Sequence, residues 1–279
     1  MRALGVPWIR IKLDMCRIVA YIGEEIRLED LVLNFPHNLM VQSYAPTELL
    51  SGSVNLDGFG CGWYNKKVES DPAQYATLLP LWADNQFPTI AKAVTSSVII
   101  SSVRNATPPL PNELSAVQPY ASGKYMFTHN GFIKVYEKFR RKMENDLPEE
   151  QFNRMQNRTD SAIIFSVFMW KLSEVQGSGS PIREALVKTL DWLKDYSSDA
   201  DFTSNLNIGI SDGENLTFIR HEIKGECNSL YYNRSHKKFP NGVFIASEAL
   251  DDDAGWNAVP ENNMIEIDLG GEPILSDLN

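Results

Sequence analysis

The chain of 279 residues carries 26 basic and 36 acidic residues, a net charge of −10, and 43% of its residues are hydrophobic. This composition supports a sizeable core and excludes a chain that is disordered over most of its length. The negative charge repels a phosphate backbone, so we expect no nucleic-acid partner. The longest uncharged apolar stretch, residues 162–170, is far shorter than the roughly 20 residues of a membrane-spanning helix, so we expect no membrane partner.

The first half of the chain is predicted to form mainly strands. Runs of β-branched and aromatic residues, bounded by glycine, proline or asparagine, indicate strands at residues 17–23, 59–64, 98–104 and 125–129. Residues 132–144 contain neither glycine nor proline and are followed by Pro148, which predicts a helix. A second helix is predicted from Asp160, because the apolar residues between 163 and 172 recur at helical spacing and Gly177 then interrupts the pattern.

A third helix is predicted to begin at Pro181, and the C-terminal third of the chain then returns to strands. Proline favours the first turn of a helix, and apolar residues follow it at helical spacing. Turn signals then separate short strand-like runs at residues 206–210, 216–220, 242–247 and 264–268. Strands, helices and strands in this order, without a long linker, predict one α+β domain in which a helical layer covers a sheet.

The cysteines Cys16, Cys61 and Cys227 lie far apart, which indicates neither a disulfide framework nor a zinc site. This usage suits a reducing cytosol, and we expect a cytoplasmic protein. Residues 1–14 lack the apolar core and the cleavage site of a secretory signal. The acidic run at residues 251–253 is interpreted as a solvated turn rather than a cation site.

Met15-Cys16 is the most informative pair of residues. If Met15 starts translation, or if a leader is removed after it, Cys16 becomes the first residue, with a free α-amine beside its thiol. An α-amine has a pKa of about 7.7–8.0 and can take the thiol proton directly or through water. The alternative is that Cys16 is a small buried hydrophobic residue in an ordinary first strand.

Five segments in order resemble the class II, or N-terminal cysteine, glutamine amidotransferase family of Ntn hydrolases. They are CRIVAYIG at 16–23, DGFGCGWY at 57–64, VRNAT at 103–107, HNG at 129–131 and TDS at 159–161. The resemblance implies a four-layer αββα sandwich of two antiparallel sheets flanked by helices. It also implies a single domain at residues 16–279 and a leader, residues 1–15, that is absent from or removed in the mature protein.

The resemblance, together with the chemistry of a γ-glutamyl amide, assigns roles to six residues. Cys16 is the expected nucleophile, and Asn130 and Gly131 are the expected donors to the oxyanion that its attack creates. Arg104 would bind the α-carboxylate of the glutamyl group and Asp160 its α-ammonium group. Thr107 matches a family position that helps to hold the same group. His129 is interpreted as structural.

Each of these residues also has a simpler interpretation. An Asn-Gly pair alone is typical of a hairpin turn, Arg104 could be a surface cation at a strand end, and Asp160 could cap a helix. The alternating Gly58, Gly60 and Gly62 do not form a dinucleotide-binding motif. The proposed chemistry needs neither a metal nor an organic cofactor.

Further segments resemble a compact branch of the family, the ergothioneine-biosynthesis amidohydrolases. They include PHNL at 36–39, NLDGFG at 55–60 and ASEALDDD at 246–253, although Ile18 and Ala249 depart from the usual histidine and proline. This branch implies a small-molecule substrate, γ-glutamyl-hercynylcysteine sulfoxide, which is hydrolysed to glutamate and hercynylcysteine sulfoxide.

Two alternatives to this function stay open. One is a subunit that releases glutamate from glutamine or glutathione with a partner protein. The other, if residues 1–15 are retained, is a non-catalytic γ-glutamyl binder or regulatory protein. The sequence leaves open whether the chain forms a homo-oligomer or binds a partner subunit.

Overall fold

The computed structural model describes residues 16–48, 54–106 and 112–278 and contains two antiparallel sheets. The first sheet has the strand order β11 (Trp256–Ala258), β9 (Tyr231–Asn233), β10 (Gly242–Ala246), β1 (Arg17–Arg27), β4 (Thr95–Val103), β2 (Phe59–Trp63) and β3 (Ala73–Thr77). The second has the order β13 (Ile274–Asp277), β12 (Asn263–Asp268), β8 (Asn215–Ile223), β7 (Ser204–Ser211), β6 (Tyr125–Ile133) and β5 (Tyr120–Ser122). The strand that follows Cys16 is therefore central in its sheet.

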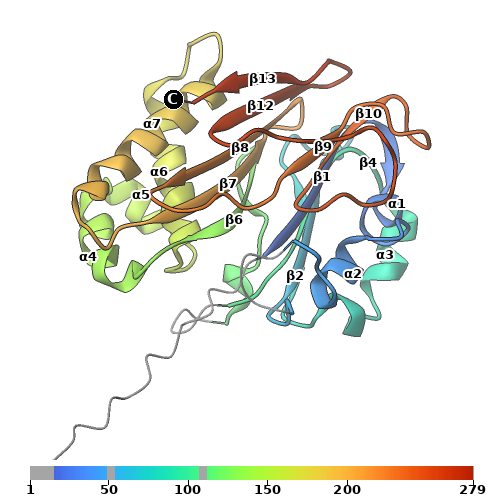
Figure 1. The fold of residues 1–279 in the computed structure, drawn as a ribbon, viewed down its shortest axis with the longest axis horizontal. Helices are drawn as coiled ribbons and strands as arrows, with labels where there is room; N and C mark the ends of the chain where they lie inside the picture. Colours follow the sequence, from blue (N-terminus) through green and yellow to red (C-terminus); the bar gives the residue numbers. More distant parts are fainter. Residues whose placement is uncertain (1–15, 49–53, 107–111, 279) are drawn as a thin grey trace, which may run out of the picture.

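Helices cover the outer face of each sheet (Figure 1). The first sheet carries α1 (Leu28–Val32), α2 (Leu39–Tyr44) and α3 (Phe87–Ala93), and the second carries α4 (Tyr136–Asp146), α5 (Glu149–Arg154), α6 (Asp160–Glu174) and α7 (Pro181–Lys194). Short 3₁₀ helices are η1 (Leu81–Ala83), η2 (Leu114–Ala116) and η3 (Asp195–Ser198). Within the described ranges, no helix has both the length and the apolar character needed to cross a membrane.

The alternation of side chains along the strands produces this layering. Successive residues of a strand point to opposite faces, and in β1 Ile18 and Ile22 face the second sheet while Val19 and Tyr21 face the helices of the first. Both faces of β1 are apolar, as expected for a strand buried on both sides. The expected αββα sandwich is confirmed, with one core between the sheets and one beneath each helical layer.

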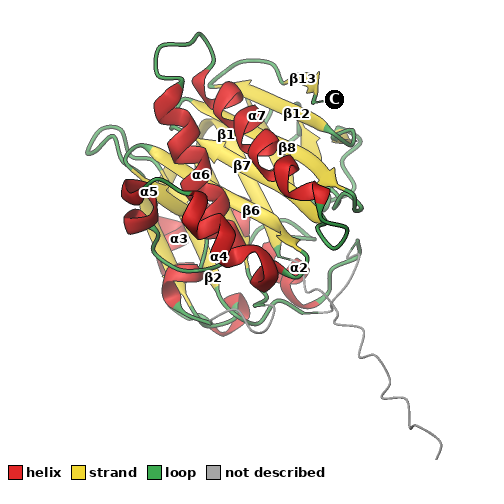
Figure 2. Cartoon of the chain, turned by 90° about the vertical axis from the view of Figure 1, so that its left-hand side faces the viewer, coloured by secondary structure: helices red, strands yellow, loops and turns green. Residues whose placement is uncertain are grey.

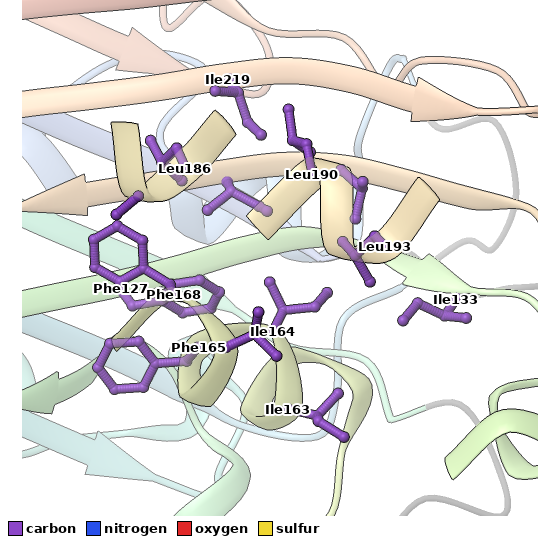
Figure 3. Close-up of a cluster of buried hydrophobic side chains, with 14 of the residues drawn as sticks. Phe127, Ile133, Ile163, Ile164, Phe165, Phe168, Leu186, Leu190, Leu193 and Ile219 are labelled. Carbon is purple, nitrogen blue, oxygen red and sulfur yellow. The ribbon is translucent and has the colours of Figure 1, made fainter. Parts of the chain in front are cut away.

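The helical layer over the second sheet forms as the apolar spacing predicts. Figure 2 shows α6 and α7 lying across β6, β7 and β8. In Figure 3, Ile164 and Phe168 of α6 and Leu186 and Leu190 of α7 meet the strand side chains, among them Phe127. This packing holds the first turn of α6, which begins at Asp160, against the sheet.

Two predicted boundaries near the expected site are wrong. Phe132 and Ile133 belong to β6 rather than to the following helix, which begins at Tyr136. The Asn130-Gly131 pair therefore lies inside a strand, and its interpretation as a hairpin turn is wrong. The backbone of Val135 is in the left-handed conformation, with φ 48°, directly before the helix, which was expected to begin at residue 132.

Candidate active site

Cys16 immediately precedes β1 and is partly exposed. Burial raises the pKa of its thiol, and the Asp160 carboxylate also raises it. A hydrogen bond from the Asn105 backbone and the positive charges of Arg104 and Arg17 lower that pKa. The structure thus brings three residues of the predicted set, Cys16, Arg104 and Asp160, close enough to interact electrostatically.

Asp160 lies in the first turn of α6, and its carboxylate reaches the sheet. Its Oδ2 accepts a hydrogen bond of 2.9 Å from the Ile133 backbone, and its Oδ1 accepts one of 2.8 Å from the Ser161 backbone. The helix cap is Thr159, whose Oγ1 accepts from the Ala162 backbone at 3.1 Å. The capping interpretation of Asp160 is therefore wrong, and each of its oxygens keeps capacity for a further donor.

Arg104 follows β4 and is buried, so it is not the surface cation of the simpler interpretation. Its backbone pairs with the segment before β2, since Arg104 N donates to Gly58 O at 2.9 Å and Arg104 O accepts from Asp57 N at 3.0 Å. Its Nη1 donates to Asn112 Oδ1 at 3.2 Å. Thr107 lies outside the described residues.

Asn130 and Gly131 lie where β6 has an open edge. The strand β5 pairs with β6 only as far as Phe127, whereas β7 pairs with it from Met126 to Ile133. On the open edge, His129 N donates to Gln118 Oε1 and Ile133 N donates to Asp160 Oδ2. Because alternate residues of a strand direct their N–H groups to the same edge, the Gly131 N–H also points there.

Gly131 could not carry a side chain at this position. A Cβ atom added to it would lie 1.8 Å from the backbone oxygen of Asn205 and 2.6 Å from Nε2 of His129. The neighbouring Asn130 is fully buried, and its Nδ2 donates to Ser247 Oγ at 3.2 Å. The strand therefore offers a backbone N–H and a side-chain amide from adjacent residues, which is a donor pair of the kind that stabilises an oxyanion.

His129 is held in one protonation state. Its Nε2 lies 3.1 Å from the backbone oxygen of Asn205, an obligatory acceptor, so Nε2 carries the proton. Its Nδ1 then accepts from Ser161 Oγ at 2.9 Å. Burial lowers the pKa of His129. Because both nitrogens form hydrogen bonds within the protein and the pKa is lowered, His129 is a poor proton acceptor, in agreement with its interpretation as structural.

A buried carboxylate, Glu248, connects the segment after the cysteine to a second part of the chain. It accepts from Arg17 Nε at 2.9 Å, from His37 Nε2 at 2.7 Å and from the backbone and side chain of Thr47 at 2.8 and 2.7 Å. Burial opposes its ionisation, but the bonds from His37 and Thr47 and the charge of Arg17 lower the pKa of Glu248 to about 2. Arg17 Nη1 also donates to the Cys16 carbonyl at 2.9 Å.

Three residues that support this arrangement were not assigned a role from the sequence. Asn228, Ser247 and Glu248 contact the Asn130 and Arg17 side chains from segments about 100 to 230 positions away. The sequence signal that could have found two of them is the Ala-Ser-Glu segment at 246–248, which marked only a resemblance. Asn228 follows no motif and lies in a loop between β8 and β9.

The described residues contain no group of three or more His, Cys, Asp or Glu side chains arranged to hold a metal ion. The acidic run is less solvated than expected, because Asp251 accepts from His236 Nε2 at 2.9 Å and from Trp256 Nε1 at 3.0 Å. Asp253 accepts from the Gly255 backbone at 2.8 Å. These two carboxylates organise the turn before β11.

The chain is similar to known proteins over most of its length. The model of the family described as glutamine amidotransferases class-II matches residues 40–275. A γ-glutamyl-hercynylcysteine sulfoxide hydrolase of Mycolicibacterium smegmatis is 30% identical over 253 residues, which cover 91% of this chain and 96% of that protein. A probable glutamine amidotransferase of Saccharomyces cerevisiae is 25% identical, with 91% of this chain and 82% of that protein covered.

A solved structure has the same fold. It is a glutamine aminotransferase class-II domain protein from Silicibacter pomeroyi, with a TM-score of 0.70 and 24% sequence identity. The alignment covers 95% of this chain and 100% of that one.

Proposed function

The chain belongs to the class-II glutamine amidotransferases, enzymes that act on C–N amide bonds, and from this premise we propose that it hydrolyses a γ-glutamyl amide with Cys16 as its N-terminal nucleophile. The observation that carries the proposal is that two residues of opposite charge lie near the Cys16 thiol. Arg104 lowers the pKa of this thiol and Asp160 raises it. A glutamyl group has an α-carboxylate and an α-ammonium group, which a guanidinium and a carboxylate complement. Bound between them, the substrate would present its side-chain amide to the thiol.

In the proposed first step, Cys16 Sγ attacks the amide carbonyl and the carbonyl electrons move to oxygen. Asn130 Nδ2 and the Gly131 N–H donate to that oxyanion. The α-amine of Cys16 accepts the thiol proton and delivers it to the departing amine when the C–N bond breaks. Water then attacks the thioester, the C–S bond breaks, and glutamate and the free thiol are released.

The α-amine is the base in this scheme because the described residues around Cys16 supply no other suitable one. Arg104 and Arg17 are cations, and Asp160 is assigned to the α-ammonium group of the substrate. His129 has no free nitrogen. The scheme requires a chain that begins at Cys16, so we infer that residues 1–15 are absent from the catalytic form. The intact mass of protein expressed from its native gene tests this, and a retained leader would contradict it.

The finer proposal concerns the substrate, which we infer to be γ-glutamyl-hercynylcysteine sulfoxide. Its support is the 30% identity to the mycobacterial hydrolase over nearly the full length of both chains. The ergothioneine branch of the family was also indicated by the segments at 36–39, 55–60 and 246–253. Hydrolysis would yield glutamate and hercynylcysteine sulfoxide.

The decisive experiment measures glutamate release by protein that begins at Cys16, with the sulfoxide, glutamine and glutathione offered in parallel. Cys16→Ala is the catalytic control, and Cys61→Ala is a matched control because Cys61 is a buried cysteine of β2. We expect release that depends on Cys16 and prefers the sulfoxide. Equal or faster release from glutamine or glutathione would reject the substrate, and release that survives Cys16→Ala would reject the nucleophile.

A further inference from the structure

We propose that Asn228 and Ser247 are positioning residues for this reaction, which together fix the direction of the Asn130 side-chain amide. The inference rests on the proposed function, in which Asn130 Nδ2 donates to the oxyanion. Asn130 contacts Asn228 on one side and Ser247 on the other. A terminal amide can rotate by 180° and exchange its NH₂ and oxygen, so only its partners decide which group faces the substrate.

The Asn228 side is fixed by a backbone carbonyl. Asn228 Nδ2 donates to the Asn130 backbone oxygen at 3.2 Å, and because that oxygen can only accept, the NH₂ group of Asn228 must face Asn130. The same NH₂ group lies 3.4 Å from Asn130 Oδ1. Rotating the Asn130 amide would bring two NH₂ groups together, so its oxygen stays on the Asn228 side.

On the other side, the Ser247 hydroxyl accepts the NH₂ group that this orientation of Asn130 directs toward it. Ile18 N donates to Ser247 Oγ at 3.0 Å, so the hydroxyl oxygen must be an acceptor there. Its second lone pair accepts from Asn130 Nδ2 at 3.2 Å. The result is a chain of hydrogen bonds with one direction, in which Asn228 donates to Asn130 and Asn130 donates to Ser247. One N–H of Asn130 is used by Ser247, and the other has no partner among the described residues.

The three residues of this hydrogen-bond chain are buried and are held in place by further hydrogen bonds. Asn130, Ser247 and Asn228 are 0%, 0% and 2% exposed. Asn228 is itself held by β7, because its backbone N–H donates to Asn205 Oδ1 at 3.3 Å and Asn207 Nδ2 donates to the next carbonyl, that of Ser229, at 2.9 Å. Ser247 also joins β10 to the nucleophile strand, since its N–H donates to Ile18 O at 2.9 Å. The oxyanion donor and the nucleophile strand thus share one hydroxyl group.

The test compares Ser247→Ala and Asn228→Asp, each alone and combined with Asn130→Ala. Asn228→Asp keeps the size of the side chain but replaces a donor by an acceptor, which favours the rotated Asn130 amide. Loss of one oxyanion donor typically lowers kcat by about 10²–10³. We expect each single variant to lower kcat by about tenfold to a hundredfold with KM within about threefold.

In the Asn130→Ala background, the same substitutions should lower kcat by less than about threefold, because residues that act through Asn130 lose their effect when it is gone. Ser247→Thr keeps the hydroxyl and should restore most of the kcat lost in Ser247→Ala. Ser211→Ala, which removes another fully buried hydroxyl far along β7, is the matched control and should leave kcat within about threefold.

Effects of equal size in the wild-type and Asn130→Ala backgrounds would overturn the inference, as would a raised KM with unchanged kcat. The thermal unfolding midpoint of every variant separates a folding defect from misorientation, and Asn228→Asp remains informative if Ser247→Ala does not fold. The kinetics use whichever γ-glutamyl amide the wild type cleaves. If the wild type releases glutamate from none of the three substrates, the proposed function and this inference are overturned together. If the wild type is active but the Ser247 and Asn228 substitutions act additively with Asn130→Ala, the inference alone is overturned.

Discussion

At the scale of single residues, some side chains of the site use all of their hydrogen-bonding groups within the protein, whereas others keep a group that the described residues do not use. Both nitrogens of His129 are used, and burial lowers its pKa. Asp160 and Asn130 each spend part of their hydrogen-bonding capacity on the protein and retain the rest. We expect the substrate to form hydrogen bonds with the groups that Asp160 and Asn130 retain, because a buried polar group without a partner is costly.

The first prediction concerns the base. If the α-amine of Cys16 accepts the proton, kcat/KM should rise with pH through about 7.7–8.0, where an α-amine loses its proton. His129 cannot produce this rise, since the pKa of its imidazole is lowered further below neutrality. An alanine inserted before Cys16 moves the amine away from the thiol and should lower kcat by about 10²–10⁴, the usual contribution of a general base. The pH profile of glutamate release is the measurement, and a profile unchanged by the insertion would contradict the role of the amine.

At the scale of elements, the site depends on how β6 ends and α6 begins. The strand carries Asn130 and Gly131, and two residues later its Ile133 N–H bonds to Asp160 in the first turn of α6. Thr159 fixes that turn as the helix cap, and its Oγ1 also lies 3.2 Å from Tyr120 OH. The cap therefore ties the turn that carries Asp160 to β5, while Asp160 itself bonds to β6.

The second prediction tests this cap. Thr159→Ala removes the acceptor for the Ala162 N–H and should lower the free energy of unfolding by about 1 kcal/mol. Because the first turn also carries Asp160, KM for the γ-glutamyl substrate should rise more than kcat falls. Thr159→Ser keeps the acceptor and serves as the control in denaturant unfolding and steady-state kinetics. A Thr159→Ala enzyme with unchanged stability would show that the turn is held by packing of α6 alone.

Local patterns predicted the central strands of both sheets and the three long helices, and long-range contacts explain the errors. The β1, β4 and β7 segments were predicted from strand-like runs between turn residues, and α7 from helical spacing and Pro181. Strand β6 was predicted to stop too early, because Asn-Gly favours turns unless neighbouring strands impose an extended backbone, as β7 does here. The positioning of Asn130 by Asn228 and Ser247 was beyond sequence reasoning, since hydrogen bonds across 98 and 117 positions leave no local pattern.

At the scale of the whole molecule, Glu248 connects distant segments of the chain. It receives hydrogen bonds from Arg17, His37 and Thr47, and through Arg17 it holds the Cys16 carbonyl. Its side chain is 1% exposed, as is that of Arg17. Breaking a buried ion pair by removing one partner costs more than the pair itself contributes, because the other charge stays buried.

The third prediction is that Glu248→Gln lowers the free energy of unfolding at pH 7 by about 3 kcal/mol. The folded-state pKa of Glu248 is lowered from 4.5 to about 2, so its contribution is fully present above about pH 4.5 and is lost as the pH falls toward 2. The variant should therefore lose less stability than the wild type over that interval. Glu214→Gln, which alters an exposed pair with Lys66, should change stability by less than about 1 kcal/mol. Parallel acid-unfolding curves for wild type and Glu248→Gln would contradict the assignment.

The pairing of β1 with β10 has a consequence for synthesis on the ribosome. Ile18 bonds to Ser247 across 229 positions, and at about 5–20 residues per second the ribosome needs about 10–50 s to make the intervening chain. Throughout that time the strand that follows Cys16 lacks its β10 neighbour, and Asn130 lacks both residues that orient its amide. The nascent chain thus lacks part of the proposed site while its beginning is already outside the ribosome. If residues 1–15 are removed as proposed, the enzymes that trim nascent chains would reach Cys16 before β10 pairs with β1.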